Sequence, residues 1–267
     1  MDFVRATDVA EAIAAKADDP NAEFVAGGTD LMVEVNLADH RPSSVIGLRH
    51  VAEIQAIDHD RIGAGVTWDR LEHGEHLALA QAARTVGSPQ IRAAGTIGGN
   101  VGTASPAGDA LPWIAALDAG IEVASRDRGR RTVPWDEFFI GVKQTSMAQD
   151  EMITAIVVTG DGVEAEQFAK VGMRNAMVIS TVSCVVARTA HGYRVALGSV
   201  APTPIRARQA EEMINAEASI SAEAITEFGR IVASEVTPIT DHRSTEIYRR
   251  HASGVLASRL LERCLRP

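Results

Sequence analysis

Two glycine-rich segments of the sequence could bind phosphate through their backbone amides. The longer one, residues 95–112, reads Gly-Thr-Ile-Gly-Gly-Asn-Val-Gly-Thr-Ala-Ser-Pro-Ala-Gly-Asp-Ala-Leu-Pro and has almost no bulky side chain. Glycine adopts backbone conformations that a Cβ atom would penalise by about 1–2 kcal/mol, so successive glycines let several N–H groups converge on one point. We therefore expect a loop here that forms an anion-binding nest.

The shorter segment, residues 26–30, follows a short apolar run that ends at Ala26 and precedes the apolar-rich residues 31–35. A strand, a tight glycine turn and a new element in succession commonly direct backbone donors at a phosphate. Two such segments indicate a ligand with two phosphates. For either segment alone, a tight turn without a ligand is the better interpretation.

Together the two segments resemble the flavoprotein subunits of the molybdenum hydroxylases, the family of xanthine dehydrogenase and carbon monoxide dehydrogenase. Residues 26–30 and 96–100 are similar to that family's two FAD-diphosphate loops, and residues 105–109 are similar to the segment after the second loop. The resemblance covers nearly the whole chain, because further similar segments follow in the family's order, at residues 135–139, 150–153, 195–204 and 248–250.

The resemblance implies an α+β fold with two domains. Residues 1–160 would form a two-lobed FAD-binding domain of the vanillyl-alcohol-oxidase (PCMH) type, with lobes at about residues 1–57 and 58–160. Residues 163–267 would form a C-terminal domain with an antiparallel three-stranded sheet followed by helices, as in the carbon monoxide dehydrogenase flavoprotein. Residues 160–162, Gly-Asp-Gly, would mark the boundary.

The resemblance also implies a division of labour among subunits. A large subunit with molybdopterin would hydroxylate the substrate, and a small subunit would pass electrons through two [2Fe–2S] clusters. The FAD of this chain would hand them to a final acceptor, which could be NAD, a quinone or another carrier. The chain would be the medium subunit of a heterotrimer that would itself be doubled, and flavin chemistry would require no catalytic side chain here.

The residues implied to contact FAD lie mainly in the two glycine segments. Amides of Gly27, Gly28 and Thr29, and of Ile97, Gly98 and Gly99, would donate to the diphosphate. Asp30 would cap the next element or contribute only its backbone, and Asp109 would accept hydrogen bonds from ribose or ribityl hydroxyls. Ile153 would pack against the cofactor, and Lys170 would lie beside the flavin instead of on the surface. The full set is Val25, Ala26, Gly27, Gly28, Thr29, Asp30, Leu31, Thr96, Ile97, Gly98, Gly99, Asn100, Ser105, Asp109, Ile153 and Lys170.

Composition limits the other functions. A chain of 267 residues can bury two domain cores. The net charge of −9 and the aromatic content of 4% argue against nucleic-acid binding. The two cysteines cannot hold an iron–sulfur cluster that needs four thiolates, and His73 and His76 are a weak metal signal. We expect no bound metal, no signal peptide and no membrane span, and hence a cytoplasmic location.

Hydrophobic patterns predict the remaining elements. Residues 7 or 8 would cap a first helix, residue 87 would end the second, and the arginines of residues 127–131 would form a solvated hairpin turn. Expected strands cover residues 24–26, 45–48, 54–57, 61–67, 121–124, 153–159, 166–171, 179–187 and 193–199. Expected helices cover residues 9–17, 77–86, 206–216, 221–234 and 244–265.

Two other functions compete with the electron-transfer subunit. A self-contained FAD-dependent oxidoreductase of the same fold would need its own acid or base near the flavin, and no such constellation is evident. A non-enzymatic assembly subunit would bind another nucleotide, or none. The colour of the purified protein separates these alternatives, because a flavoprotein is yellow.

Overall fold

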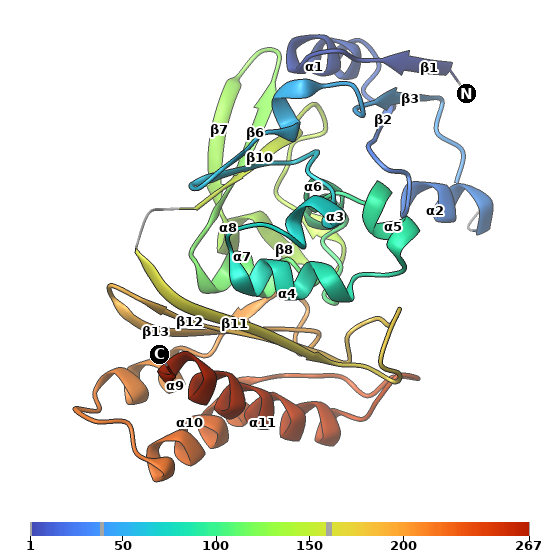
Figure 1. The fold of residues 1–267 in the computed structure, drawn as a ribbon. Helices are drawn as coiled ribbons and strands as arrows, with labels where there is room; N and C mark the ends of the chain where they lie inside the picture. The colour runs from blue at the N-terminus through green and yellow to red at the C-terminus, as the bar shows by residue number, and fades with distance from the viewer. Residues whose placement is uncertain (1, 38–39, 159–161, 267) are drawn as a thin grey trace.

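The computed structural model describes residues 2–37, 40–158 and 162–266 (Figure 1). Its N-terminal lobe contains a parallel sheet in the order β1-β3-β2, which lies beside helix α1. The Asp8 carboxylate caps α1 by accepting a hydrogen bond of 2.7 Å from the Glu11 amide, which confirms the expected helix start. The elements of this lobe are β1 (Asp2–Arg5), α1 (Val9–Asp18), β2 (Glu23–Val25), α2 (Leu31–Leu37) and β3 (Ser44–Gly47).

The second lobe is built on a five-stranded antiparallel sheet in the order β4-β5-β10-β6-β7. Two expected strands are corrected here. The strand expected at residues 54–57 is instead the 3₁₀ helix η1 (Ala52–Gln55) followed by β4 (Ile57–Asp58). The strand expected at residues 61–67 is β5 (Arg61–Gly63), which ends where the chain turns and the Val66 amide donates to the Gly63 carbonyl. The other strands are β6 (Gly120–Ser125), β7 (Gly129–Pro134) and β10 (Met152–Val157).

Short helices and one hairpin fill the space around this sheet. Helix α4 agrees with the expectation for residues 77–86. The expected solvated arginine turn is present between β6 and β7, and its exposed residues Arg128, Arg130 and Arg131 form ion pairs with Asp150, Glu53 and Glu151, respectively. The elements are α3 (Trp68–Leu71), α4 (Leu77–Thr85), α5 (Pro89–Ala94), α6 (Ile97–Thr103), α7 (Leu111–Ala116), α8 (Trp135–Phe138), β8 (Phe139–Gly141) and β9 (Gln144–Thr145).

The long glycine segment contains a helix at the place where the sequence predicts a loop that forms an anion-binding nest. Helix α6 runs through Gly98 and Gly99, and the non-glycine Ala104 ends it with a φ of 46°. The helix forms because the Thr96 hydroxyl caps it, accepting a hydrogen bond of 3.1 Å from the Gly99 amide. A sequence rich in glycine has low helix propensity, so the pattern predicted a loop.

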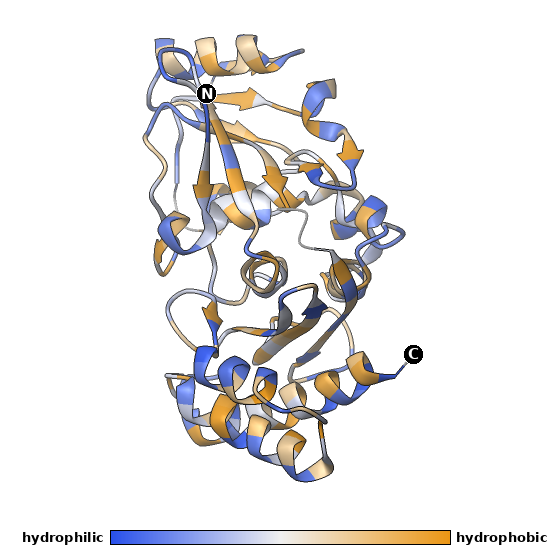
Figure 2. Ribbon diagram, turned by 90° about the vertical axis from the view of Figure 1, so that its left-hand side faces the viewer, coloured by the Kyte–Doolittle hydropathy of each residue, from blue (hydrophilic) through white to orange (hydrophobic). Residues whose placement is uncertain are grey.

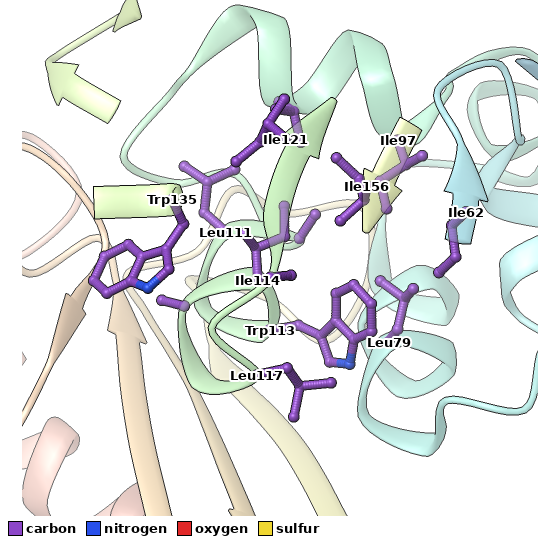
Figure 3. Packing of buried hydrophobic residues seen from close by; sticks show 14 of the residues in the cluster. Ile62, Leu79, Ile97, Leu111, Trp113, Ile114, Leu117, Ile121, Trp135 and Ile156 are labelled. Atoms are coloured by element: carbon purple, nitrogen blue, oxygen red, sulfur yellow. The ribbon is translucent and has the colours of Figure 1, made fainter. Parts of the chain in front are cut away.

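A single hydrophobic core joins these helices to the sheet. Figure 3 shows Trp113 and Ile114 of α7 packed with Leu79 of α4, Ile97 of α6 and Ile156 of β10. All five side chains are almost completely buried. This core fixes the start of α6, and with it one wall of the site described below.

The C-terminal domain is a four-stranded antiparallel sheet with helices α9–α11 on one face, while α4 and α7 lie against the other face (Figure 1). The three expected strands and three expected helices are present. The sheet also contains a short fourth strand, and β12 begins three residues later than expected. The elements are β11 (Val163–Val171), β12 (Val182–Thr189), β13 (Gly192–Gly198), β14 (Ile205–Arg206), α9 (Arg208–Asn215), α10 (Ala222–Glu235) and α11 (Glu246–Leu265).

Strand β12 is buried on both faces, which explains its nearly continuous apolar sequence. Cys184 and Val186 belong to the core under α11, whereas Val185 and Ala187 belong to the core of the second lobe. Figure 2 shows both hydrophilic and hydrophobic colours in this sheet and in the helices below it. Residues 160 and 161 of the predicted domain boundary lie outside the described residues.

A buried carboxylate joins the two domains. Glu166 of β11 accepts hydrogen bonds from the Ala78 amide at 3.0 Å and from the Trp113 indole N–H at 3.1 Å, so it caps α4 from the neighbouring domain. His76 is the N-cap residue of α4, and its ring packs edge-on against Trp113. Burial raises the pKa of the Glu166 carboxyl above its ordinary value.

We expect Glu166→Gln to lower the free energy of unfolding by about 1–3 kcal/mol, because the glutamine amide would leave a buried donor without an acceptor. The folded wild type binds a proton at Glu166 more tightly than the unfolded chain does, so the stability that this group contributes falls as pH rises. The difference from the variant should therefore be larger at pH 5 than at pH 8, as measured by urea unfolding. Glu164→Gln, at an exposed ion pair on the same strand, is the matched control. A difference that grows with pH would contradict this prediction.

Candidate functional site

A cavity of about 820 Å³ separates the first lobe from the second and reaches the C-terminal domain. Residues of both glycine segments line it, including residues 105, 107 and 108 of the longer one, together with the β8–β9 hairpin, the start of β10, and Ile179 of the C-terminal domain. Its volume is at the upper end of the ~300–1,000 Å³ typical of small-molecule sites. The cavity is therefore large enough for an extended, dinucleotide-sized ligand.

The first glycine segment packs directly on the second. A Cβ atom at Gly27 would lie 1.8 Å from the Ala94 carbonyl oxygen, so only glycine allows this approach. Gly28 has a φ of +68°, which glycine adopts at little cost. The two glycines thus place residues 27–31 along the wall of the cavity.

The backbone donors of this segment are not used inside the protein. Within the described part of the chain, the amides of residues 27–31 make no hydrogen bond. Thr103 donates a hydrogen bond of 2.7 Å to the Asp30 carboxylate, so this carboxylate binds α6 and does not cap α2. A row of unsatisfied N–H groups that lines a cavity is the donor set that binds a diphosphate.

The backbone amides at the start of the second segment have hydrogen-bond acceptors inside the protein, unlike those of the first segment. The Ile97 amide donates to the Val66 carbonyl at 3.0 Å, and the Gly98 amide donates to the Ala64 carbonyl at 2.8 Å. Since the Gly99 amide donates to the Thr96 hydroxyl, the expectation that these three amides face the ligand is wrong for this structure. Ile97 lies in the core and does not line the cavity.

Gly98 is so closely packed that its substitution would affect the fold as well as ligand binding. The sequence alone predicts that Gly98→Val removes the ligand and leaves the fold. A Cβ atom at Gly98 would lie 2.6 Å from the Ala64 carbonyl oxygen, so valine there would also displace the backbone that follows β5. Gly99 is open except for the Thr96 hydroxyl at 3.2 Å from the added Cβ, and it lines the cavity. Gly99 is therefore the better position for a test.

Asp109 and Lys170 form a buried ion pair beside the cavity. The Lys170 ammonium lies 2.6 Å from Asp109 Oδ2 and also donates to the carbonyls of Thr85 and Val178. The Ser180 hydroxyl donates to Asp109 Oδ1 at 2.5 Å. Burial raises the pKa of the Asp109 carboxyl, and Lys170 and Ser180 oppose this rise. Neither member of the pair lines the cavity, so their contacts with a cofactor stay predictions.

Most predicted site residues nevertheless gather around the cavity. Those that line it are Val25, Ala26, Gly27, Gly28, Thr29, Asp30, Leu31, Thr96, Gly98, Gly99, Asn100, Ser105 and Ile153. The sequence did not indicate Lys16, which also lines the cavity and whose ammonium donates to the carbonyls of Pro20 and Ala22. No sequence motif identifies this lysine, because its position at the cavity depends on how α1 packs beside β2.

The described residues contain no group of three or more His, Cys, Asp or Glu side chains that could hold a metal ion. Cys184 and Cys264 are free thiols and buried. Within the same residues, no helix combines the length and apolar character needed to cross a membrane.

Comparisons with known proteins agree with this geometry. Residues 1–158 match the family model described as FAD binding domain in molybdopterin dehydrogenase. Residues 167–264 match the CO dehydrogenase flavoprotein C-terminal domain. The xanthine dehydrogenase FAD-binding subunit of Escherichia coli O157:H7 is 31% identical over 97% of this chain and 94% of its own length. The nicotinate dehydrogenase FAD-subunit of Eubacterium barkeri is 33% identical over 72% of this chain and 71% of its own length.

The fold is also that of a solved relative. The structure of carbon monoxide dehydrogenase from Hydrogenophaga pseudoflava contains a chain with a TM-score of 0.89 and 27% identity, covering 99% of this chain and 96% of the other. The predicted resemblance, fold class and cofactor are thereby confirmed. The chain belongs to the FAD-binding medium subunits of the molybdenum hydroxylases, the oxidoreductase family of xanthine dehydrogenase and carbon monoxide dehydrogenase.

Proposed function

We propose that this subunit passes electrons from the [2Fe–2S] clusters of a partner subunit through its FAD to a final acceptor such as NAD. The observation that carries the proposal is the cavity wall of residues 27–31, whose amides are free to bind a diphosphate. The chain has two cysteines, too few for a four-thiolate cluster, so the electrons must come from elsewhere. The complex would be a cytoplasmic heterotrimer with a large molybdenum-cofactor subunit and a small iron–sulfur subunit, doubled into a dimer.

The residues present fit FAD. The amides of residues 27–31 would hold the diphosphate, and Ile153 would pack against an apolar part of the cofactor. FAD supplies the exchange of electrons when it is bound. The protein contributes binding, orientation and the exclusion of water, because the buried core of the second lobe forms one wall and the C-terminal domain closes another.

The carboxylates around the cavity favour this function over a self-contained oxidoreductase. Glu23 contacts His40, Glu34 pairs with Lys143, and Glu151 pairs with Arg131. The Asp30 carboxylate binds Thr103. Because each of these acidic side chains already has a partner, none of them is free to act as a base on a substrate beside the flavin.

The first experiment is an absorption spectrum of the purified chain and mass analysis of the cofactor released on denaturation. Wild type should release about one FAD per chain, whereas Gly99→Val should retain at most a tenth of it, because the added side chain enters the cavity. Circular dichroism should show both proteins folded. Ala222→Val, at an exposed first residue of α10, is the control and should keep FAD.

Electron transfer needs a second readout. The flavin should be reduced by substrate of the holoenzyme only when the partner subunits are present. A chain that bleaches with its own substrate alone would identify a self-contained oxidoreductase. A colourless wild type that takes up no added FAD, or a Gly99→Val protein with stoichiometric FAD, would contradict the proposed site.

A further inference from the structure

A buried arginine of the C-terminal domain binds three acceptors at one end of the sheet. Arg249 lies in the first turn of α11 and is 3% exposed. Its Nη1 donates to the carbonyls of Thr181 at 2.7 Å and Ser199 at 2.9 Å, and its Nη2 donates to the Asp241 carboxylate at 2.7 Å. Because a guanidinium is planar and always charged, it holds these acceptors in one geometry. The residue before β12, the residue after β13 and the turn before α11 are therefore fixed relative to one another.

Ser199 connects this arginine to the wall of the FAD cavity. The Ser199 amide donates to the Pro106 carbonyl at 2.7 Å, and both neighbours of Pro106, Ser105 and Ala107, line the cavity. Ser199 has a φ of 64°, a conformation that non-glycine residues rarely adopt and that persists where the surroundings fix it. The hydrogen bond to Pro106 thus depends on a backbone conformation that the bond from Arg249 stabilises.

A second series of hydrogen bonds leads from Ser199 through Ser180 to the same segment. The Ser199 hydroxyl donates to the Ser180 carbonyl at 2.9 Å. The buried Ser180 hydroxyl in turn donates to Asp109 Oδ1 at 2.5 Å. Ile179, next to Ser180, lines the cavity. The contacts of Ser199 therefore hold both the segment of residues 105–109 and the part of the C-terminal domain that closes the cavity.

We infer that Arg249 is a positioning residue for FAD, which sets the affinity and the orientation of the cofactor although it does not line the cavity. The inference rests on FAD binding in this cavity, which the proposed function includes. Arg249 acts through Ser199 and Thr181, which adjoin two walls of the site. A site holds its ligand in one orientation when a second set of contacts fixes the groups that line it. Without Arg249, we expect Ser199 to leave its strained conformation and residues 105–109 to become mobile.

The next residue of α11, Arg250, offers a matched control. Its Nη1 donates to the carbonyls of Ala233 at 3.1 Å and Val236 at 2.7 Å, so its removal also leaves two backbone acceptors without their donor. Both acceptors lie at the end of α10, and neither residue lines the cavity. A variant at Arg250 therefore shows what the loss of an arginine from α11 does to the fold alone.

The test uses the full-length chain, from which FAD is removed and to which FAD is then added back. Arg249→Met should raise the dissociation constant of FAD at least about tenfold, because the hydrogen bonds of a charged group are lost. It should also change the visible circular dichroism of the bound flavin, which reports the surroundings of the ring. Arg249→Lys keeps the charge and three donors, so it should stay within about threefold of the wild-type constant. Arg250→Met should match wild type in both measurements.

A variant that removes less of the structure covers the case in which Arg249→Met does not fold, as judged by far-ultraviolet circular dichroism. Ser199→Ala removes only the hydrogen bond from the hydroxyl to the Ser180 carbonyl. It should raise the dissociation constant about threefold, as expected for the loss of one neutral hydrogen bond.

Three results would overturn the inference. The first is a wild-type dissociation constant in Ser199→Ala together with a wild-type constant in Arg249→Met or failure of that variant to fold. The second is an equal loss of affinity in Arg250→Met, which would assign the effect to destabilisation of α11. The third is an Arg249→Lys protein that binds FAD no better than Arg249→Met. Failure of the proposed function would look different, because the wild-type chain would then bind no FAD.

Discussion

The Lys170→Met variant is expected to lose about 3–5 kcal/mol of unfolding free energy, because it leaves the Asp109 carboxylate buried without its cation. The ion pair is 2.6 Å long, and each side chain is 7% exposed. Lys170 also binds the carbonyls of Thr85 and Val178, so its removal loosens the contact between α4 and the C-terminal domain. Ile179, next to Val178, lines the cavity, so we expect weaker FAD retention as well.

Urea unfolding of the purified chain checks this prediction. Lys143→Met removes an exposed ion pair and is the control, with an expected loss below about 1 kcal/mol. A double variant, Asp109→Leu with Lys170→Met, should regain most of the lost stability, because it removes the uncompensated charge. If the double variant were as unstable as Lys170→Met, the loss would come from packing and not from the buried charge.

The loss of unfolding free energy in the Lys170→Met variant should also depend on pH. Burial raises the pKa of Asp109 even with Lys170 in place, and removing the cation removes the group that opposes this rise. The folded variant therefore holds a proton that the unfolded chain releases, so its stability falls as pH rises through the raised pKa. The difference from wild type should be smaller at pH 5 than at pH 8. A difference independent of pH would contradict this prediction, because it would show that Asp109 is protonated to the same extent in the folded variant and in the folded wild type.

The sequence pattern predicted the C-terminal domain well, because β12 is buried on both faces and reads as one apolar run. It predicted helix α6 wrongly, because propensity counts its glycines as unfavourable and cannot include the Thr96 cap or the packing of Gly98 on Ala64. The same limit explains why the apolar pattern predicts a strand at residues 54–57, where the structure begins with the 3₁₀ helix η1.

The site was predictable where a motif lies along the chain. Residues 25–31 are consecutive in the sequence and all line the cavity. A motif read along the chain therefore contains this whole part of the site. Asp109 and Lys170 are 61 residues apart, and their pairing depends on how the two domains meet. Lys16 and Ile179 were missed for the same reason, since each reaches the cavity through the packing of a whole element.

The Arg206→Met variant is expected to lose about 3–5 kcal/mol, because Arg206 neutralises two carboxylates at the domain interface. Its guanidinium donates to both Glu211 oxygens at 2.8 and 2.5 Å, and to Asp118 at 2.6 Å. The Arg206 and Glu211 side chains are 4% and 7% exposed, so little water reaches the charges. Arg206→Lys should lose less, although an ammonium cannot reproduce the two parallel hydrogen bonds to Glu211.

Arg230→Met, at an exposed pair with Glu227 on α10, is the control for urea unfolding and should lose below about 1 kcal/mol. The gap to wild type narrows on acidification, as for Lys170→Met, but here the cause is the lowered pKa of Asp118 in the folded wild type. Burial acts to raise the pKa of Asp118, but hydrogen bonds from Arg206 and Trp135 hold it below its ordinary value. The stability that this carboxylate contributes is present at neutral pH and is lost as pH falls through the lowered pKa. The gap between wild type and Arg206→Met should therefore narrow as pH falls below the ordinary carboxyl pKa of 3.8 toward the lowered pKa, and a gap that widens on acidification would contradict the assigned role of Asp118.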